Sequence, residues 1–255
     1  MTKKNFISGA SRPKNVKLTE VKKLGVLGSG LMGHGITYVS ALSGLKVVMT
    51  DATQENADKG FSRIKVILNE ELKQGRTTKG KIDKILSRIT ATANYDKLRN
   101  CDLIIEAVFE DRDLKGKVTT EAEKIMDSNG VFASNTSTLP ITGLAEKSIR
   151  PEKFIGIHFF SPVHKMKLVE IIKGDKTNDE TIATAFDFVL KIRKIPIVVN
   201  DSRGFYTSRV FSTYPNEGLA LLAEGNHPQE IETAGKKAGM PVGPLAVIDE
   251  VNIGL

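Results

Sequence analysis

Residues 26–35 of this 255-residue chain read VLGSGLMGHG, and a second apolar run, residues 45–50, ends at Asp51. The order of apolar strand, glycine turn, helix, apolar strand and acid is typical of the βαβ unit that binds a dinucleotide. Gly28 permits the tight turn, Gly30 lets the backbone approach a pyrophosphate, and Gly33 lets the helix pack closely on the strand. The N–H groups that begin this helix would then face the phosphates.

The acid at the end of the second strand predicts which dinucleotide is bound. Asp51 follows Gly28 by 23 residues, about the distance at which a carboxylate binds the adenine ribose. Residues 52–55, ATQE, include no arginine, so a 2′-phosphate would meet repulsion there. The sequence therefore predicts NAD rather than NADP as the cofactor. The alternative is a glycine turn that binds no ligand.

Composition limits the other functions that this chain could have. Cys101 is the only cysteine, which excludes an internal disulfide and favours a reducing compartment such as the cytoplasm. No apolar run approaches the ~20 residues that span a bilayer, so we expect no membrane span. The net charge of +7 is concentrated in residues 1–25, where seven cations and one anion leave +1 for the rest. A nearly neutral body argues against a nucleic-acid-binding face.

Strand and helix patterns alternate through about residue 200, which predicts an α/β fold with a Rossmann-like, doubly wound, mostly parallel sheet. We expect strands at about 23–28, 45–50, 90–93, 102–108, 131–134, 153–160, 167–172 and 195–199. Helices are expected at about 31–43, 54–74, 79–88, 112–127, 140–147 and 179–191. From residue 201 the pattern is all-helical, at about 205–224 and 228–238, and the chain stops at the start of another helix. We therefore expect a leader or interdomain linker at 1–22, an NAD-binding domain at 23–200, and the beginning of a truncated helical domain at 201–255.

Two polar residues interrupt apolar strands late in the sheet. His158 lies in GIHFF, residues 156–160, and Glu170 lies in LVEII, residues 168–172. If these strands form an antiparallel hairpin that turns near His164, the two residues oppose each other directly and share a face. A carboxylate beside an imidazole fixes its tautomer and raises its basicity, which suits a general base. The alternative is a core histidine paired with a structural carboxylate.

Polar residues also follow two other strands. The cluster SNTST, residues 134–138, follows an apolar strand and lies where open α/β sheets bind ligands, although helix capping is an alternative for some of these side chains. Glu106 and Glu110 follow the strand at 102–108, and Lys115 lies one helical turn further on, where it could reach a cofactor or an acid. A lone lysine is usually solvated. No group of residues has metal-ligand spacing, so we predict no metal.

Five motifs occur in order: GSGLMGHG at 28–35, IEAVFE at 105–110, SNTS at 134–137, HFFSP at 158–162 and KLVE at 167–170. Together they resemble the L-3-hydroxyacyl-CoA dehydrogenases of fatty acid β-oxidation, over about residues 23–255. The segments ASRP, residues 10–13, and GFY, residues 204–206, further resemble the dehydrogenase part of bacterial multifunctional fatty acid oxidation α subunits. In those proteins an enoyl-CoA hydratase domain precedes this part.

The resemblance implies a role for each matching residue. His158 would be the general base, Glu170 its orienting partner, and Ser137 the group that binds the reacting oxygen of the substrate. The resemblance also implies a set of NAD ligands, with Asn135 ordering the nicotinamide side: Gly28, Gly30, Leu31, Met32, Gly33, Asp51, Glu110, Lys115 and Asn135. The family's helical domain completes the acyl-CoA cleft and supplies a dimer contact, and a homodimer or a thiolase-containing complex is implied.

The chain departs from the family pattern at two serines. Many members of the family have an asparagine near the catalytic pair, and at the matching position this chain has Ser208. Ser161 likewise replaces a frequent asparagine after the two phenylalanines. Serine keeps a hydrogen-bonding group but has a shorter reach, which affects substrate geometry rather than the class of reaction.

The sequence thus predicts NAD-dependent oxidation of an L-3-hydroxyacyl-CoA to a 3-ketoacyl-CoA. Two alternatives stay open at this point: another β-hydroxyacid dehydrogenase that uses a lysine base, and an inactive relative that binds NAD.

Overall fold

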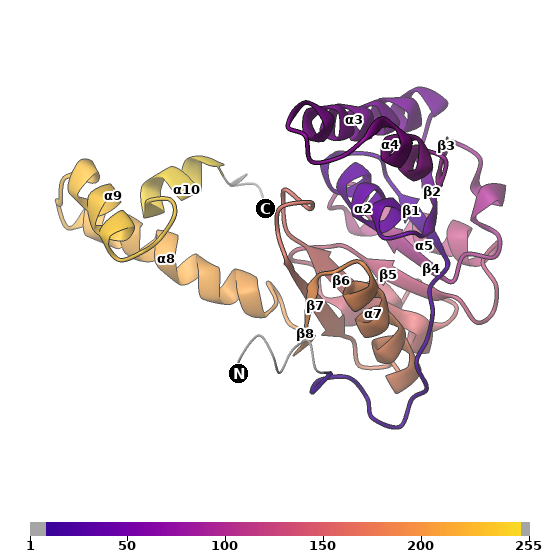
Figure 1. Ribbon diagram of the computed structural model, residues 1–255. Coiled ribbons are helices and arrows are strands. Elements are labelled where there is room, and N and C mark those ends of the chain that lie inside the picture. The colour runs from indigo at the N-terminus through magenta and orange to yellow at the C-terminus, as the bar shows by residue number, and fades with distance from the viewer. Residues whose placement is uncertain (1–8, 251–255) are drawn as a thin grey trace. The chain divides into compact units, whose positions relative to one another are not determined.

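The computed structural model describes residues 9–250, with the backbone alone for Glu250. One eight-stranded sheet, in the order β3-β2-β1-β4-β5-β6-β7-β8, organises the chain as far as residue 200 (Figure 1). Every neighbouring pair of strands is parallel except β6 and β7, which are antiparallel. The predicted doubly wound α/β fold is therefore confirmed. The strands are β1 (Lys23–Leu27), β2 (Lys46–Thr50), β3 (Ile89–Thr92), β4 (Leu103–Glu106), β5 (Val131–Ser134), β6 (Phe154–Phe159), β7 (Leu168–Lys173) and β8 (Ile195–Asn200).

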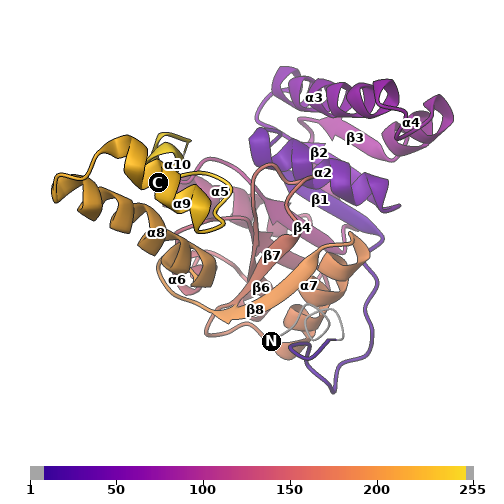
Figure 2. The same cartoon turned by 60° about the vertical axis from the view of Figure 1, so that its left-hand side comes forward.

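Helices cover both faces of this sheet. On one face α2 packs on β1 and β2, α3 packs on β3 and α2, and α7 packs on β6, β7 and β8 (Figures 1 and 2). On the other face α5 packs on β4, and α6 packs on β6. Several helices begin at a residue whose side chain accepts a backbone N–H, as Thr53, Asp111 and Asn178 do. The helices of this part are α2 (Leu31–Leu42), α3 (Gln54–Lys73), α4 (Lys79–Leu86), α5 (Arg112–Glu123), α6 (Ile141–Ala145) and α7 (Asp179–Lys191).

Side chains alternate between the two faces of each strand, and this alternation sets what the site contains. Odd-numbered residues such as Ile105, Ile155 and Ile157 join the core beneath α2 and α7. The residues between them point to the face of α5 and α6, which places His158 and Glu106 on that side. Because helices cover both faces of the sheet, the strands are buried on both sides, and their sequences are therefore near-continuous apolar runs.

The helical segment beyond the sheet forms a second compact unit. The chain divides into one unit that ends at Ser202 and another that begins at Arg203. The second contains α8 (Tyr206–Ala223), α9 (Pro228–Lys237) and α10 (Pro244–Glu250). Within it the Tyr214 hydroxyl donates to the carbonyl of Val242, and the Glu232 carboxylate accepts the N–H of Leu245. The predicted domain boundaries, after residues 22 and 200, stay predictions.

Two local features differ from the sequence predictions: the end of β4, and two short turns. The strand expected at 102–108 ends at Glu106, because the chain leaves the sheet there. Two 3₁₀ helices, η1 (Tyr95–Leu98) and η2 (Pro151–Lys153), were not predicted, since such short turns leave no periodic pattern. The segment before β1, expected to be a leader or linker, is bound to α7 through Arg12 and Asp187. Residues 1–8 of that leader and residues 251–255 lie outside the described residues. Between residues 9 and 250, no helix is both long and apolar enough to cross a membrane.

Candidate active site

The glycine turn after β1 has the conformation that the sequence predicts. Gly28 has a φ of +93°, and a Cβ there would lie 2.6 Å from the carbonyl oxygen of Ala107. A Cβ on Gly33 would lie 1.8 Å from the carbonyl oxygen of Gly28, so helix and turn are in direct contact. A Cβ on Gly30, in contrast, would have no atom within 4 Å.

The start of α2 leaves donors for a ligand. Gly30 is the N-cap of α2, and no side chain of the described residues caps it. The first N–H groups of a helix have no acceptor within the helix, so those at Leu31 and Met32 are available to an anion. This open, uncapped turn fits a pyrophosphate.

Asp51 lies next to this turn at the end of β2. One carboxylate oxygen accepts hydrogen bonds from the Ser29 N–H and hydroxyl, both at 2.7 Å, and the other accepts the N–H of Ala52 at 2.8 Å. Burial alone would raise the pKa of Asp51, but the hydrogen bonds from Ser29 and Ala52 outweigh it and hold the pKa below its usual value. Asp51 is therefore a carboxylate at neutral pH, as the predicted binding of ribose hydroxyls requires.

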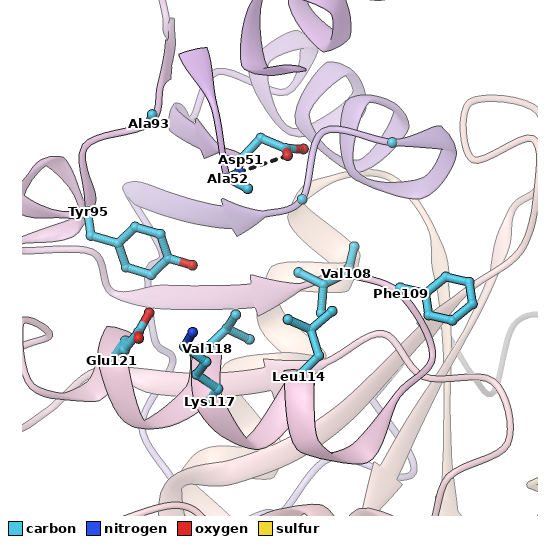
Figure 3. Close-up of a pocket in the computed structure, with 13 residues that line it drawn as sticks. Asp51, Ala52, Ala93, Tyr95, Val108, Phe109, Leu114, Lys117, Val118 and Glu121 are labelled. Carbon is cyan, nitrogen blue, oxygen red and sulfur yellow. Dashed lines mark hydrogen bonds between the residues drawn. The ribbon is translucent and has the colours of Figure 1, made fainter. Parts of the chain in front are cut away.

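A cavity of about 520 Å³ opens between this turn and α5 (Figure 3). Of the predicted NAD ligands, Gly28, Gly30 and Asp51 line it. Figure 3 shows Tyr95 and Glu121 at one end of the cavity and the ring of Phe109 at the other. The remaining lining residues are Ala52, Ala93, Ala107, Val108, Leu114, Lys117 and Val118. A cavity of this size and mixed lining fits a nucleotide.

Tyr95 lines this cavity and was not predicted from the sequence. Burial, followed by the charges of Glu121 and Asp51, raises the pKa of Tyr95 to about 12. Its ring therefore stays neutral beside two carboxylates, and Figure 3 shows its hydroxyl directed into the cavity. One signal could have found Tyr95: it follows β3 closely, at the carboxyl edge of the parallel sheet, where ligands bind.

Lys115 is buried and ion-paired rather than solvated. Its Nζ atom lies 2.9 Å from Oε1 of Glu106 and 3.2 Å from Oε2 of Glu110. Lys115 and Glu106 are both almost completely buried, and the Ser134 hydroxyl donates to Glu106 as well. Lys115 does not line the cavity beside Asp51, so any effect on NAD would pass through the two carboxylates that it holds.

Glu110 organises the loop that follows β5. Its carboxylate accepts hydrogen bonds from the Thr136 hydroxyl and from the N–H of Ser137, the latter at 3.1 Å. Burial acts to raise the pKa of Glu110, but the Lys115 charge and these hydrogen bonds hold it below its usual value. The adjacent Asn135 accepts the N–H of Phe159 at 2.9 Å and thereby links this loop to β6.

His158 and Glu170 meet as the hairpin register predicts. They are direct partners in the antiparallel pairing of β6 and β7, and Nδ1 of His158 lies 2.8 Å from Oε2 of Glu170. Glu170 is fully buried and His158 is 6% exposed. The pairing is confirmed, whereas the catalytic role of the two residues stays a prediction.

The remaining predicted residues have varied surroundings. Ser137 is half-buried in the loop held by Glu110, and Ser161 is exposed after β6. Ser208 lies in α8, within the second unit, and its carbonyl accepts the Ser212 hydroxyl. Cys101 is buried, and burial raises the pKa of its thiol to about 12, so the thiol stays protonated and unreactive at neutral pH. Among residues 9–250, no group of three or more histidine, cysteine or acidic side chains could hold a metal ion.

Comparisons with known proteins agree with this geometry. Residues 23–202 match the family model "3-hydroxyacyl-CoA dehydrogenase, NAD binding domain", and residues 204–255 match that of the C-terminal domain of the same enzymes. The chain is 43% identical over 235 residues to the fatty acid oxidation complex subunit alpha of Idiomarina loihiensis, and 40% identical over 237 residues to that of Psychrobacter arcticus. These matches cover 92% and 93% of this chain but 33% of each relative, so the chain spans about a third of their length.

Solved structures of 3-hydroxybutyryl-CoA dehydrogenases are also similar to this chain. An (S)-3-hydroxybutyryl-CoA dehydrogenase from Ralstonia eutropha superimposes with a TM-score of 0.88 at 37% identity, covering 91% of this chain and 82% of its own. A 3-hydroxybutyryl-CoA dehydrogenase from Escherichia coli also has a TM-score of 0.88, at 31% identity, covering 91% of this chain and 50% of its own. The fold and the cofactor expected from the sequence are thereby confirmed, and the sheet domain is an NAD-binding domain. The chain belongs to the 3-hydroxyacyl-CoA dehydrogenase family.

Proposed function

We propose that this chain oxidises the 3-hydroxyl group of an L-3-hydroxyacyl-CoA to a ketone, with NAD as the hydride acceptor. One observation carries the proposal: a buried imidazole and a buried carboxylate, His158 and Glu170, lie 2.8 Å apart on one face of the sheet. The pair lies at the sheet edge where the parallel strands end, as do Asp51 and the loop of Ser137. Family membership supports the same reaction.

His158 acts as the general base in this proposal. With Nδ1 directed at Glu170, the ring donates its Nδ1 proton to the carboxylate, and in this proposal the other ring nitrogen, Nε2, accepts the proton of the substrate hydroxyl. Glu170 then stabilises the imidazolium that forms. Base assistance of this kind is typically worth about 10²–10⁴ in rate. When bound, NAD would supply the acceptor for the hydride of C3.

Other residues hold the reactants. The Ser137 hydroxyl binds the reacting oxygen, and Asn135 orders the nicotinamide side. Gly28, Gly30 and the N–H groups of Leu31 and Met32 would hold the pyrophosphate of NAD, and Asp51 would hold its adenine ribose. Glu110 and Lys115 act on NAD through the loop that Glu110 holds. The open turn at Gly30 and the cavity beside Asp51 support this assignment.

The names of the relatives support a proposal for the pathway and the assembly. Two curated relatives are α subunits of fatty acid oxidation complexes, so we infer a place in bacterial, cytoplasmic fatty acid β-oxidation and a partner subunit such as a thiolase. A homodimer through the helical domain is the second assembly that we propose. We also propose that residues 23–200 form the NAD-binding domain and that residues 201–255 begin the helical domain.

The reaction is tested by the loss of NADH absorbance with acetoacetyl-CoA as substrate. A parallel assay offers the ketones of small β-hydroxyacids, with NADH and with NADPH. Rapid turnover of acetoacetyl-CoA with NADH supports the proposal. Turnover of the small acids alone would assign the chain to another dehydrogenase class, and NADH binding without turnover of any substrate would make it a non-catalytic relative.

A further inference from the structure

The loop that carries Ser137 is held by two carboxylates from elsewhere in the chain, one at each end. At its start Glu110 accepts the N–H groups of Ser137 and Thr138, at 3.1 and 3.4 Å. At its end the carboxylate of Asp201 accepts the N–H groups of Ile141 and Thr142, at 2.9 and 2.8 Å. These are the first two residues of α6.

Asp201 supplies a cap that α6 cannot supply from its own sequence. The N-cap position is Pro140, whose side chain has no acceptor, and no hydrogen bond from it caps the helix. Each oxygen of the Asp201 carboxylate takes one N–H, and a negative charge at a helix start is favourable. The cap comes from 60 residues further along the chain, after β8.

The same anchor is connected to the strand of the general base. Ile141 is fully buried and packs on Gly156 of β6, where a Cβ would lie 2.8 Å from Ile141 Cδ1. Gly156 lies two residues before His158 on the same face of the strand. The N–H that Asp201 binds therefore belongs to a residue in contact with β6.

Asp201 also lies where the chain leaves the sheet domain. The first compact unit ends one residue later, at Ser202, and the second begins at Arg203. Gly204, in the second unit, has a φ of +63°, a turn that other residues rarely adopt. The fixed point before this turn is the hydrogen-bonded carboxylate of Asp201.

We propose that Asp201 is a positioning residue for the dehydrogenase reaction. It fixes the Ser137 loop relative to His158 and Glu170, and it ties that loop to the start of the connection to the helical unit. The inference rests on the proposed function for its kinetic consequence, and on the hydrogen bonds of Asp201 for its structural one.

The test compares Asp201→Ala and Asp201→Asn with Asn178→Ala in the full protein. Asn178 caps α7 by accepting the N–H of Thr181 at 2.9 Å, so its loss is a matched loss of a helix cap away from the site. The readouts are kcat and KM with acetoacetyl-CoA, the Kd of NADH, and hydrogen exchange at residues 135–145. If Asp201→Ala folds poorly, Asp201→Asn, which has the same size, carries the test.

We expect Asp201→Ala to lower kcat roughly ten- to a hundredfold, because a small displacement of a positioning group has effects of this size. The Kd of NADH should change less than about twofold, and the amides of 136–142 should exchange faster. Asn178→Ala should lower the melting temperature and leave kcat unchanged.

Two results would overturn the inference. One is a kcat for the Asp201 variants equal to that of Asn178→Ala, and the other is unchanged exchange at residues 136–142. If the unmodified protein does not reduce acetoacetyl-CoA, the proposed reaction fails, and the exchange measurement alone then decides whether Asp201 holds the loop.

Discussion

Nδ1 of His158 lies 2.8 Å from Oε2 of Glu170, and the two residues face each other across the antiparallel pair β6 and β7. Because both side chains are buried, water competes little for this contact. The contact orients the imidazole, which a general base requires. The first two predictions follow from this geometry.

Replacement of His158 by glutamine removes the base but keeps a polar side chain of similar size. We expect kcat with acetoacetyl-CoA to fall about 10²–10⁴-fold. The Kd of NADH, measured by calorimetry, should stay within about twofold, because Gly28, Gly30 and Asp51 are untouched. Full activity in His158→Gln would remove His158 from the mechanism.

Glu170→Gln removes the negative charge that stabilises the imidazolium. We expect kcat to fall at least roughly tenfold, less than for His158→Gln, because the base itself remains. If Glu170 acts through His158, the double variant should be no slower than His158→Gln alone. Steady-state rates of the two single variants and the double variant complete the cycle, and additive losses would show that Glu170 acts independently.

The register that brings this pair together could be predicted from the sequence alone. The strands at 154–159 and 168–173 are apolar apart from these two polar side chains and a terminal lysine, and a one-residue slip would have placed the two side chains on opposite faces. The glycine turn and Asp51 were predictable for a similar reason, since the βαβ unit fixes their spacing.

Contacts between distant segments could not be predicted. Lys115 looks like a solvated helix residue until β4 and β5 bring Glu106 and its hydrogen-bond partners around it. Tyr95 lies in a single 3₁₀ turn, and Asp201 reaches a helix 60 residues earlier in the chain. In each case the partner is set by the tertiary fold, and no local periodicity records it.

In the proposed site, the charge of Asp51 is expected to favour NAD over NADP. Asp51→Asn keeps the size and one acceptor oxygen but removes the charge that repels a 2′-phosphate. We expect the ratio of the NADPH to the NADH dissociation constants to fall roughly tenfold, in line with a change of about 1–2 kcal/mol for one charge near a surface. Asp83→Asn, at an exposed position of α4, is the control that should leave the ratio unchanged. An unchanged ratio in Asp51→Asn would assign selectivity to another residue.

Lys194 should make the stability of the protein depend on pH above neutrality. Lys194 is 6% exposed, and its ammonium group donates to the carbonyls of Val163 and Met166, at 2.6 and 2.5 Å. Burial lowers its pKa from 10.5 to about 8. Between these values the unfolded chain binds more protons than the folded one, so stability increases with pH across this window.

The contribution of Lys194 is measured against Lys194→Met in urea unfolding at several pH values. The cost of burying the charge is fully present below about pH 8 and is relieved as the pH rises toward 10.5. The free energy of unfolding of the unmodified protein should therefore increase relative to that of Lys194→Met between pH 8 and 10.5. A constant difference across this range would contradict the prediction.

Arg12 should stabilise the sheet domain although it lies before the first strand. Its Nε and Nη2 atoms donate to the two oxygens of Asp187 at 2.7 and 2.8 Å, and its other donors bind carbonyls of its own segment, including Val16 at 2.8 Å. Thr19 donates to the same carboxylate through its N–H at 3.0 Å. The segment is thus fixed to α7 by a carboxylate with several donors.

Arg12→Ala would leave Asp187 with a largely buried charge that has lost its cation. We expect the free energy of unfolding to fall by about 3 kcal/mol, the typical cost of removing one partner of such a pair. Lys14→Ala, an exposed cation in the same segment, is the control and should change it by less than about 0.5 kcal/mol. Equal stability of the two variants in urea unfolding would mean that the contact between this segment and α7 does not stabilise the sheet domain.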